Sequence, residues 1–141
     1  MDKFPEFVAN NWYLFIALAI IIFMLAKDMM SQGMSGIKNV EPTLATQMIN
    51  HDNAIILDVR EEKEFNEGHI LNSIHIPLKS VEGKLKELEK YKNRPVIVNC
   101  RSGQRSMTIC SLLSKNGFEK VFNMGGGIMA WKNANLPVNK V

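Results

Sequence analysis

Hydrophobic and polar residues are distributed unevenly along this chain. From Trp12 to Ala26, fifteen consecutive residues carry no polar side chain except the Tyr13 hydroxyl. After residue 36, short apolar runs alternate with amphipathic stretches. This change in pattern predicts two regions with different surroundings, an apolar N-terminal segment and a folded domain.

The apolar segment is long enough, as a helix, to cross a bilayer only if its N-terminal neighbours are included. Fifteen helical residues extend about 22 Å, which is short of the hydrocarbon core of about 30 Å. Residues 7–26 make a span of twenty residues and about 30 Å. Trp12 and Tyr13 would then lie at one membrane interface, and Lys27 could reach the other.

Three interpretations of this segment compete. A core helix that is apolar on every face needs partners on every side, and the rest of the chain is small. A cleaved signal peptide needs a cationic start and small residues at the cleavage site, and this segment offers neither. We therefore expect one uncleaved transmembrane anchor over residues 1–27, followed by a tether over residues 28–36 and a domain over residues 37–141.

The lysines on either side of the segment predict its orientation. Lys3 precedes the segment, whereas Lys27 and Lys38 follow it, which favours a cytoplasmic C-terminal domain. We expect a single-pass protein of the inner (cell) membrane that contacts lipid through residues 7–26. The two cysteines could form a disulfide in an oxidising compartment, but the chemistry inferred below needs one of them free.

Composition excludes several protein classes and hides this division. The 141 residues are 46% hydrophobic and 22% charged, with a mean hydropathy of −0.06. These values exclude a collagen-like, disordered or disulfide-scaffold chain. The near-zero mean results from adding an apolar helix to a polar domain.

The pattern of residues 37–141 is typical of an α/β domain. Apolar runs predict strands at 54–57, 73–76, 95–99 and 121–122. Helical spacing and end signals predict helices from 42 or 43 to 50, and at 81–91, 104–115 and 127–133. Strands that alternate with helices favour a parallel sheet flanked by helices on both faces. Ligands of such sheets bind beyond the C-terminal ends of the strands, where Asp58 and Cys100 fall.

The stretch that follows the strand at 95–99 is the strongest candidate for chemistry. The strand stops at Cys100, small and polar residues with Gly103 follow, and a helix then begins. Successive backbone N–H groups in such a loop can converge on one anion and can favour a thiolate over a thiol. Arg101 and Arg105 add positive charge. Cys110 lies within the helix and is expected to be a buried structural cysteine.

Several motifs, taken in order, resemble the rhodanese family of sulfurtransferases. Their residues extend over about 40–137 and read Leu57-Asp58-Val59-Arg60 with Glu64-Phe65, Gly68-His69-Ile70, Ser73-Ile74-His75-Ile76-Pro77, Cys100-Arg101-Ser102-Gly103-Gln104-Arg105, Gly117-Phe118, Val121, and Met124-Gly125-Gly126-Gly127 with Trp131. The resemblance implies a rhodanese-like fold behind the membrane anchor. It also implies that Cys100 carries sulfur as a persulfide.

The resemblance also suggests roles for the loop residues. Cys100 is the expected catalytic residue, and the expected anion-binding residues are Arg101, Ser102, Gly103, Gln104 and Arg105. Asp58, Arg60 and Ser106 are candidates for loop support. The alternative for the first two is a turn or helix cap at Asp58 and a side-chain pair between Arg60 and Glu64. His69 is expected to be structural.

The expected reaction is a double displacement through an exposed Cys100 thiolate, from a small donor such as thiosulfate to cyanide or a protein thiol. The related dual-specificity phosphatases have a longer Cys-x5-Arg loop, whereas Arg105 closes a Cys-x4-Arg loop here. The alternative function is a membrane-tethered persulfide carrier or protein-interaction module with little thiosulfate turnover. No metal ligands at zinc spacing and no nucleotide motif are present, so no cofactor is expected. A net charge of +4 from residue 37 onward does not indicate nucleic-acid binding.

Overall fold

The computed structural model describes residues 3–34 and 37–140. The chain divides into two compact units, residues 1–36 and residues 37–141.

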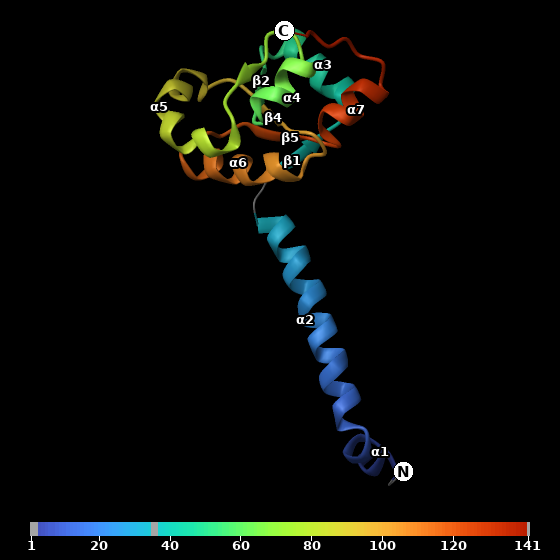
Figure 1. Ribbon diagram of the computed structural model, residues 1–141. Coiled ribbons are helices and arrows are strands. Elements are labelled where there is room, and N and C mark those ends of the chain that lie inside the picture. The colour runs from blue at the N-terminus through green and yellow to red at the C-terminus, as the bar shows by residue number, and fades with distance from the viewer. Residues whose placement is uncertain (1–2, 35–36, 141) are drawn as a thin grey trace. The chain divides into compact units, whose positions relative to one another are not determined.

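The N-terminal unit consists of two helices, α1 (Lys3–Asn10) and α2 (Trp12–Met34) (Figure 1). They are bent by 70° relative to each other. The break lies at Asn11, whose side-chain Nδ2 donates to the carbonyl oxygen of Phe7 at 2.8 Å. An asparagine that bonds its own preceding turn competes with the regular helical ladder, which accounts for the interruption.

The continuous span predicted over residues 7–26 is therefore wrong in its geometry. Among the described residues, no helix alone meets the length and hydropathy of a membrane span, and Lys3–Asn10 with Trp12–Lys27 does so only as a bent pair. Helix α2 also continues beyond the predicted anchor through most of the predicted tether, as far as Met34. Residues 35–36 of that tether lie outside the described residues.

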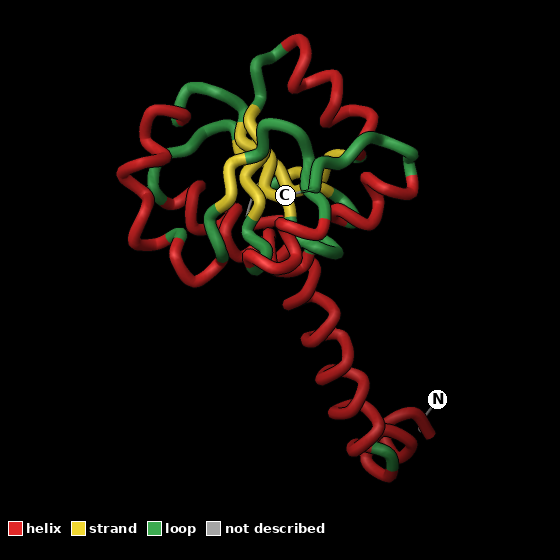
Figure 2. Tube along the Cα trace, turned by 45° about the horizontal axis from the view of Figure 1, so that its top comes forward, coloured by secondary structure: helices red, strands yellow, loops and turns green. Residues whose placement is uncertain are grey.

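The second unit is built on a parallel sheet flanked by helices on both faces, as predicted, and the sheet has five strands (Figures 1 and 2). The strand order is β1-β5-β4-β2-β3, and every pairing is parallel. The strands are β1 (Lys38–Val40), β2 (Ile55–Asp58), β3 (Ile74–His75), β4 (Val96–Asn99) and β5 (Val121–Met124). The two central strands β2 and β4 are buried along their whole length, so both faces of the sheet are covered.

Alternation along the central strands separates the core into two layers. Ile55, Leu57, Val96 and Val98 pack on one face, with α6 (Gln104–Lys115) and α5 (Leu85–Leu88). Ile56 and Ile97 pack on the other face, with α3 (Pro42–His51) and α7 (Gly127–Asn133). Successive strand residues point to opposite faces of the sheet, so each of these short apolar strands contributes side chains to both core layers.

Three local predictions differ from the structure. Strand β1 and the short helix α4 (Glu62–Glu67) were not predicted. The single helix predicted at 81–91 is instead a series of short turns, η2 (Glu82–Lys84), α5 and η3 (Glu89–Tyr91), preceded by η1 (Leu78–Ser80). Gly83 lies in the first of these turns and lowers the helical propensity of the segment.

Candidate active site

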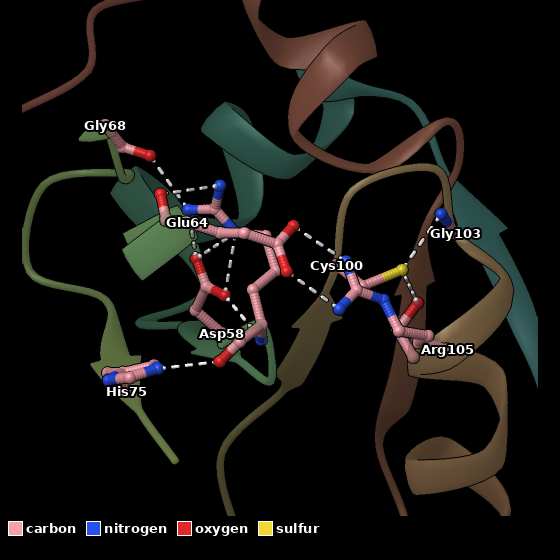
Figure 3. A network of polar contacts seen from close by, with 9 residues as sticks. Asp58, Glu64, Gly68, His75, Cys100, Gly103 and Arg105 are labelled. Atoms are coloured by element: carbon pink, nitrogen blue, oxygen red, sulfur yellow. Dashed lines mark hydrogen bonds and ion pairs between the residues drawn. The ribbon is translucent and has the colours of Figure 1, made fainter. Parts of the chain in front are cut away.

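Cys100 lies directly after β4, at the C-terminal edge of the sheet, and the loop from Cys100 to Gly103 leads into α6. The Gly103 N–H donates to the Sγ atom of Cys100 at 3.0 Å (Figure 3). Gly103 has a φ of +95°, a left-handed conformation that glycine adopts without strain. The glycine therefore lets the loop fold back so that its own N–H faces the sulfur.

The loop and the start of α6 lower the pKa of the Cys100 thiol below its ordinary value. Burial alone would raise the pKa, but hydrogen bonds from the Ser106 side chain and from the backbone of Ser106, Gly103 and Ser102 outweigh it. Donors aimed at sulfur stabilise the thiolate, which is the nucleophilic form. The predicted convergence of backbone donors on Cys100 is thus present in the structure.

The Cys100 side chain is fully buried, with 0% exposure. The sequence predicted an exposed thiolate, and this prediction is wrong for the structure described. The side chain faces the core layer that contains Ile109 and Leu113. A substrate that donates sulfur therefore reaches the Sγ atom only when neighbouring atoms move aside.

Ser106 connects the cysteine to a buried polar chain. In the thiol, the Cys100 S–H donates to Ser106 Oγ at 3.3 Å and the Ser106 hydroxyl donates to Oδ1 of Asn123. In the thiolate, the Ser106 hydroxyl donates to Sγ instead, which is the bond that lowers the pKa of Cys100. Asn123 Nδ2 donates to the Gly103 carbonyl at 3.0 Å and to Asn39 Oδ1 at 2.9 Å. The support role suggested for Ser106 agrees with these contacts. The asparagines on β5 and β1 complete the chain, and the sequence analysis did not single them out.

The anion-binding residues predicted around the loop are in different environments. Arg101, Ser102 and Gln104 are exposed. Arg105 is instead paired with Glu64 of α4: its Nη1 and Nη2 atoms donate to the two carboxylate oxygens at 2.9 and 2.8 Å. These hydrogen bonds lower the pKa of Glu64 and raise the pKa of Arg105.

Asp58 and Arg60 form a buried ion pair, with side-chain exposures of 0% and 3%. The Asp58 carboxylate accepts from the backbone N–H of Arg60 at 3.0 Å and from its guanidinium at 2.8 to 3.1 Å. The Arg60 guanidinium also donates to the carbonyl oxygens of Glu64 at 3.2 Å and Gly68 at 2.8 Å. The Arg60 guanidinium therefore holds the backbone of α4 at Glu64 and just after its C-terminal end, at Gly68.

Among the described residues, no side-chain hydrogen bond joins Asp58 or Arg60 to residues 100–106. Their support of the loop is indirect, because α4 carries Glu64, and Glu64 holds Arg105 (Figure 3). The alternative side-chain pair between Arg60 and Glu64 is also wrong: Arg60 binds the backbone of Glu64, whose carboxylate is taken by Arg105. The i,i+4 spacing of Arg60 and Glu64 fits a bond to the backbone of Glu64 as well as a bond to its carboxylate, so the spacing alone does not predict which one forms.

Helix α7 packs its first turn against the cysteine loop. The N–H groups of Ile128 and Met129 donate to the carbonyl oxygens of Cys100 at 2.8 Å and of Arg101 at 3.3 Å. Gly127 has a φ of +59°, and a Cβ atom there would lie 2.6 Å from the Arg101 carbonyl. This contact between Gly127 and the cysteine loop was not predicted from the sequence.

The remaining cysteine and two histidines have structural surroundings. Cys110 is fully buried, as predicted, and burial raises its pKa to about 12. Phe65 stacks between the rings of His69 and His75, with centroids 3.9 and 4.3 Å away. Within residues 3–34 and 37–140, no group of three or more His, Cys, Asp or Glu side chains is placed to hold a metal ion.

A cavity of about 260 Å³ lies beside the loop, between α4 and α7. Cationic side chains, carboxylates and apolar side chains all line it, namely Arg60, Glu64, Glu67, Arg101, Ile128, Met129 and Lys132. The space next to the cysteine loop therefore carries both signs of charge.

Comparison with known proteins extends over both units. The rhodanese-like domain family matches residues 41–134. The uncharacterized protein YibN of Escherichia coli is 34% identical over 140 residues, which cover 98% of this chain and 97% of YibN. The thiosulfate sulfurtransferase GlpE of Actinobacillus succinogenes is 31% identical, over 70% of this chain and 87% of GlpE. The crystal structure of a rhodanese-related protein from Thermoplasma volcanium has a TM-score of 0.66 and 31% identity, and covers 72% of this chain and 97% of that protein.

Proposed function

This chain belongs to the rhodanese-like domain family, and on that basis we propose that it is a membrane-anchored sulfurtransferase that carries sulfur as a persulfide on Cys100. One observation carries the proposal: Cys100 lies at the end of β4 with loop donors directed at Sγ, which lower its pKa. A relative named thiosulfate sulfurtransferase supports thiosulfate as one donor.

The proposed reaction has two displacements. The Cys100 thiolate attacks the outer sulfur of thiosulfate, an Sγ–S bond forms, and the bond to the sulfonate sulfur breaks. Sulfite leaves with the electron pair, so no oxidant is required. Cyanide in an assay, or a protein thiolate in the cell, then attacks the outer sulfur of the persulfide and restores the Cys100 thiolate.

The loop stabilises negative charge at both stages. Before transfer, the donors to Sγ favour the thiolate. After transfer, the outer sulfur of the persulfide bears the charge, and backbone N–H groups of the loop together with the exposed guanidinium of Arg101 supply positive potential near it. In this proposal the residues of the anion loop are Arg101, Ser102, Gly103, Gln104 and Arg105.

The proposed anchor rests on exposed apolar surface in the N-terminal unit. Ile16, Leu18, Ile20 and Ile22 of α2 are between 49% and 57% exposed. A continuous apolar surface of this kind requires a cover, and we propose that lipid of the cell membrane supplies it, with the catalytic domain on the cytoplasmic side. The match to YibN covers 98% of this chain and so includes most of this unit.

A second candidate function is a persulfide carrier or protein-interaction module with little thiosulfate turnover. The pairing of Arg105 with Glu64 favours it, because a paired guanidinium is less available to an incoming sulfonate.

The central test is mass spectrometry of the full chain after thiosulfate treatment. We expect one added sulfur atom on Cys100, absent in Cys100→Ser and retained in the matched variant Cys110→Ser. Turnover with thiosulfate and cyanide then separates enzyme from carrier. A wild-type turnover rate no higher than that of Cys100→Ser contradicts the proposed enzymatic activity.

The anchor is tested separately by alkaline extraction of membranes from cells that express the full chain. The wild-type chain should stay in the membrane pellet, and a chain with Leu18→Lys and Ile22→Lys should be released. Release of the wild-type chain contradicts the anchor and leaves the sulfur chemistry untouched.

A further inference from the structure

The side chain best placed to bind an oxoanion at this loop is already bound to a carboxylate. Both terminal nitrogens of Arg105 donate to the two oxygens of Glu64, at 2.9 and 2.8 Å. This two-point contact is the geometry in which a guanidinium binds a carboxylate or a sulfonate. Glu64 therefore occupies the position on Arg105 that the sulfonate of thiosulfate would take.

The exchange of Glu64 for thiosulfate is unfavourable for two reasons. The dianion must displace a carboxylate that already satisfies the guanidinium, and the displaced Glu64 carboxylate then adds negative charge near the bound donor. The pair is partly buried, with side-chain exposures of 28% for Glu64 and 36% for Arg105, so water screens its charges only in part.

The cavity beside the loop points to a donor of another kind. Its walls combine three cations and two carboxylates with two apolar side chains, namely Arg60, Arg101, Lys132, Glu64, Glu67, Ile128 and Met129. A small dianion meets repulsion from the two carboxylates among these five charged groups. An organic group with both an ammonium and a carboxylate finds a partner for each, and its hydrocarbon part can pack on the apolar side chains.

We propose that Glu64 is a specificity-determining residue, which disfavours thiosulfate and directs the site toward organic persulfides whose carrier group bears both signs of charge. The inference rests on the proposed function, because it concerns the donor that loads Cys100. In the loading step the Cys100 thiolate attacks the outer sulfur of the persulfide R–S–S⁻. An Sγ–S bond forms, the S–S bond of the donor breaks, and the thiolate R–S⁻ leaves with the electron pair.

The experiment compares the rates at which two donors load Cys100 in the full chain. Thiosulfate and glutathione persulfide are mixed with wild type, Glu64→Gln and Glu62→Gln, and the persulfide on Cys100 is followed by mass spectrometry. Glu62→Gln is the matched control, since it removes the same charge from the exposed face of the same helix. Glu64→Ala is the second variant if Glu64→Gln does not fold.

Loss of the Glu64 carboxylate should raise the thiosulfate rate relative to the glutathione persulfide rate by about fivefold, the range of a partly exposed ion pair. Glu62→Gln should leave that ratio unchanged. If both donors load Cys100 but Glu64→Gln and Glu64→Ala leave the ratio unchanged, or slow both donors alike, Glu64 is only structural and the inference is wrong. If neither donor loads wild-type Cys100, the proposed function itself fails, and this inference fails with it.

Discussion

The carbonyl of Arg101 lies so close to Gly127 that a Cβ atom on residue 127 would be 2.6 Å from it. Helix α7 can begin against the cysteine loop only because this position has no side chain, and its positive φ of +59° adds a second reason for glycine.

Gly127→Ala should therefore lower the free energy of unfolding by about 2–4 kcal/mol, through backbone strain and overpacking. Urea denaturation measures the change. Gly83→Ala is the control, since nothing lies within 4 Å of a Cβ atom at that position. Equal stability of the two variants would show that the loop accommodates the extra carbon.

Ser106→Ala should raise the pKa of Cys100, because it removes the strongest of the hydrogen bonds that lower it. Below the pKa the sulfur is protonated and reacts slowly, so the midpoint of alkylation by iodoacetamide should move to higher pH. The wild-type midpoint should lie below the ordinary cysteine value of 9.0. Ser111→Ala, which removes a hydroxyl of the same helix bonded only to the Met107 carbonyl, should leave the midpoint in place.

Cys110 should resist alkylation in the folded protein. It is fully buried, and burial raises its pKa to about 12, so almost no thiolate is present at neutral pH. Peptide mapping after brief iodoacetamide treatment should find label on Cys100 and none on Cys110, whereas both react in urea. Equal labelling of both cysteines under native conditions would contradict the opposite directions in which their pKa values are displaced.

The two ion pairs near the site should differ in their contribution to stability. Asp58→Ala leaves the buried guanidinium of Arg60 without its charge partner and should cost about 3–5 kcal/mol. Glu64→Ala breaks a partly exposed pair and should cost at most about 1 kcal/mol. Chemical denaturation measures the free energy of unfolding of both variants. A larger loss of stability in Glu64→Ala than in Asp58→Ala would contradict this prediction.

Features encoded in neighbouring residues could be predicted from the sequence. The central strands are short apolar runs rich in β-branched residues, and Asn116-Gly117 marks the end of α6. The turn from β4 to α6 around Cys100 follows from one glycine between a strand and a helix. Each of these signals lies within a few residues of the feature it predicts.

Features that depend on distant partners could not be predicted in this way. In strand β1 only Val40 is buried, and the strand exists because its backbone pairs with β5. Helix α4 has no buried residue, and Arg60 holds its backbone at Glu64 and at Gly68, just after its C-terminal end. Arg105 is paired with Glu64, 41 residues away in the sequence, and a spacing rule has no access to such a contact.

The pairing of β1 with β5 also has a consequence for the order of events at the ribosome. The first strand of the domain, at residues 38–40, has its register partner at residues 122–124. All residues from 38 to 124 must therefore be synthesised before the sheet can close, whereas helices α1 and α2 are made before any strand of the sheet. The cysteine loop and α6 leave the ribosome before β5, so Asn123 arrives to complete the buried polar chain only after the residues it supports. Synthesis of β5 thus becomes the step after which the sheet can form and the domain can leave its aggregation-prone unfolded state.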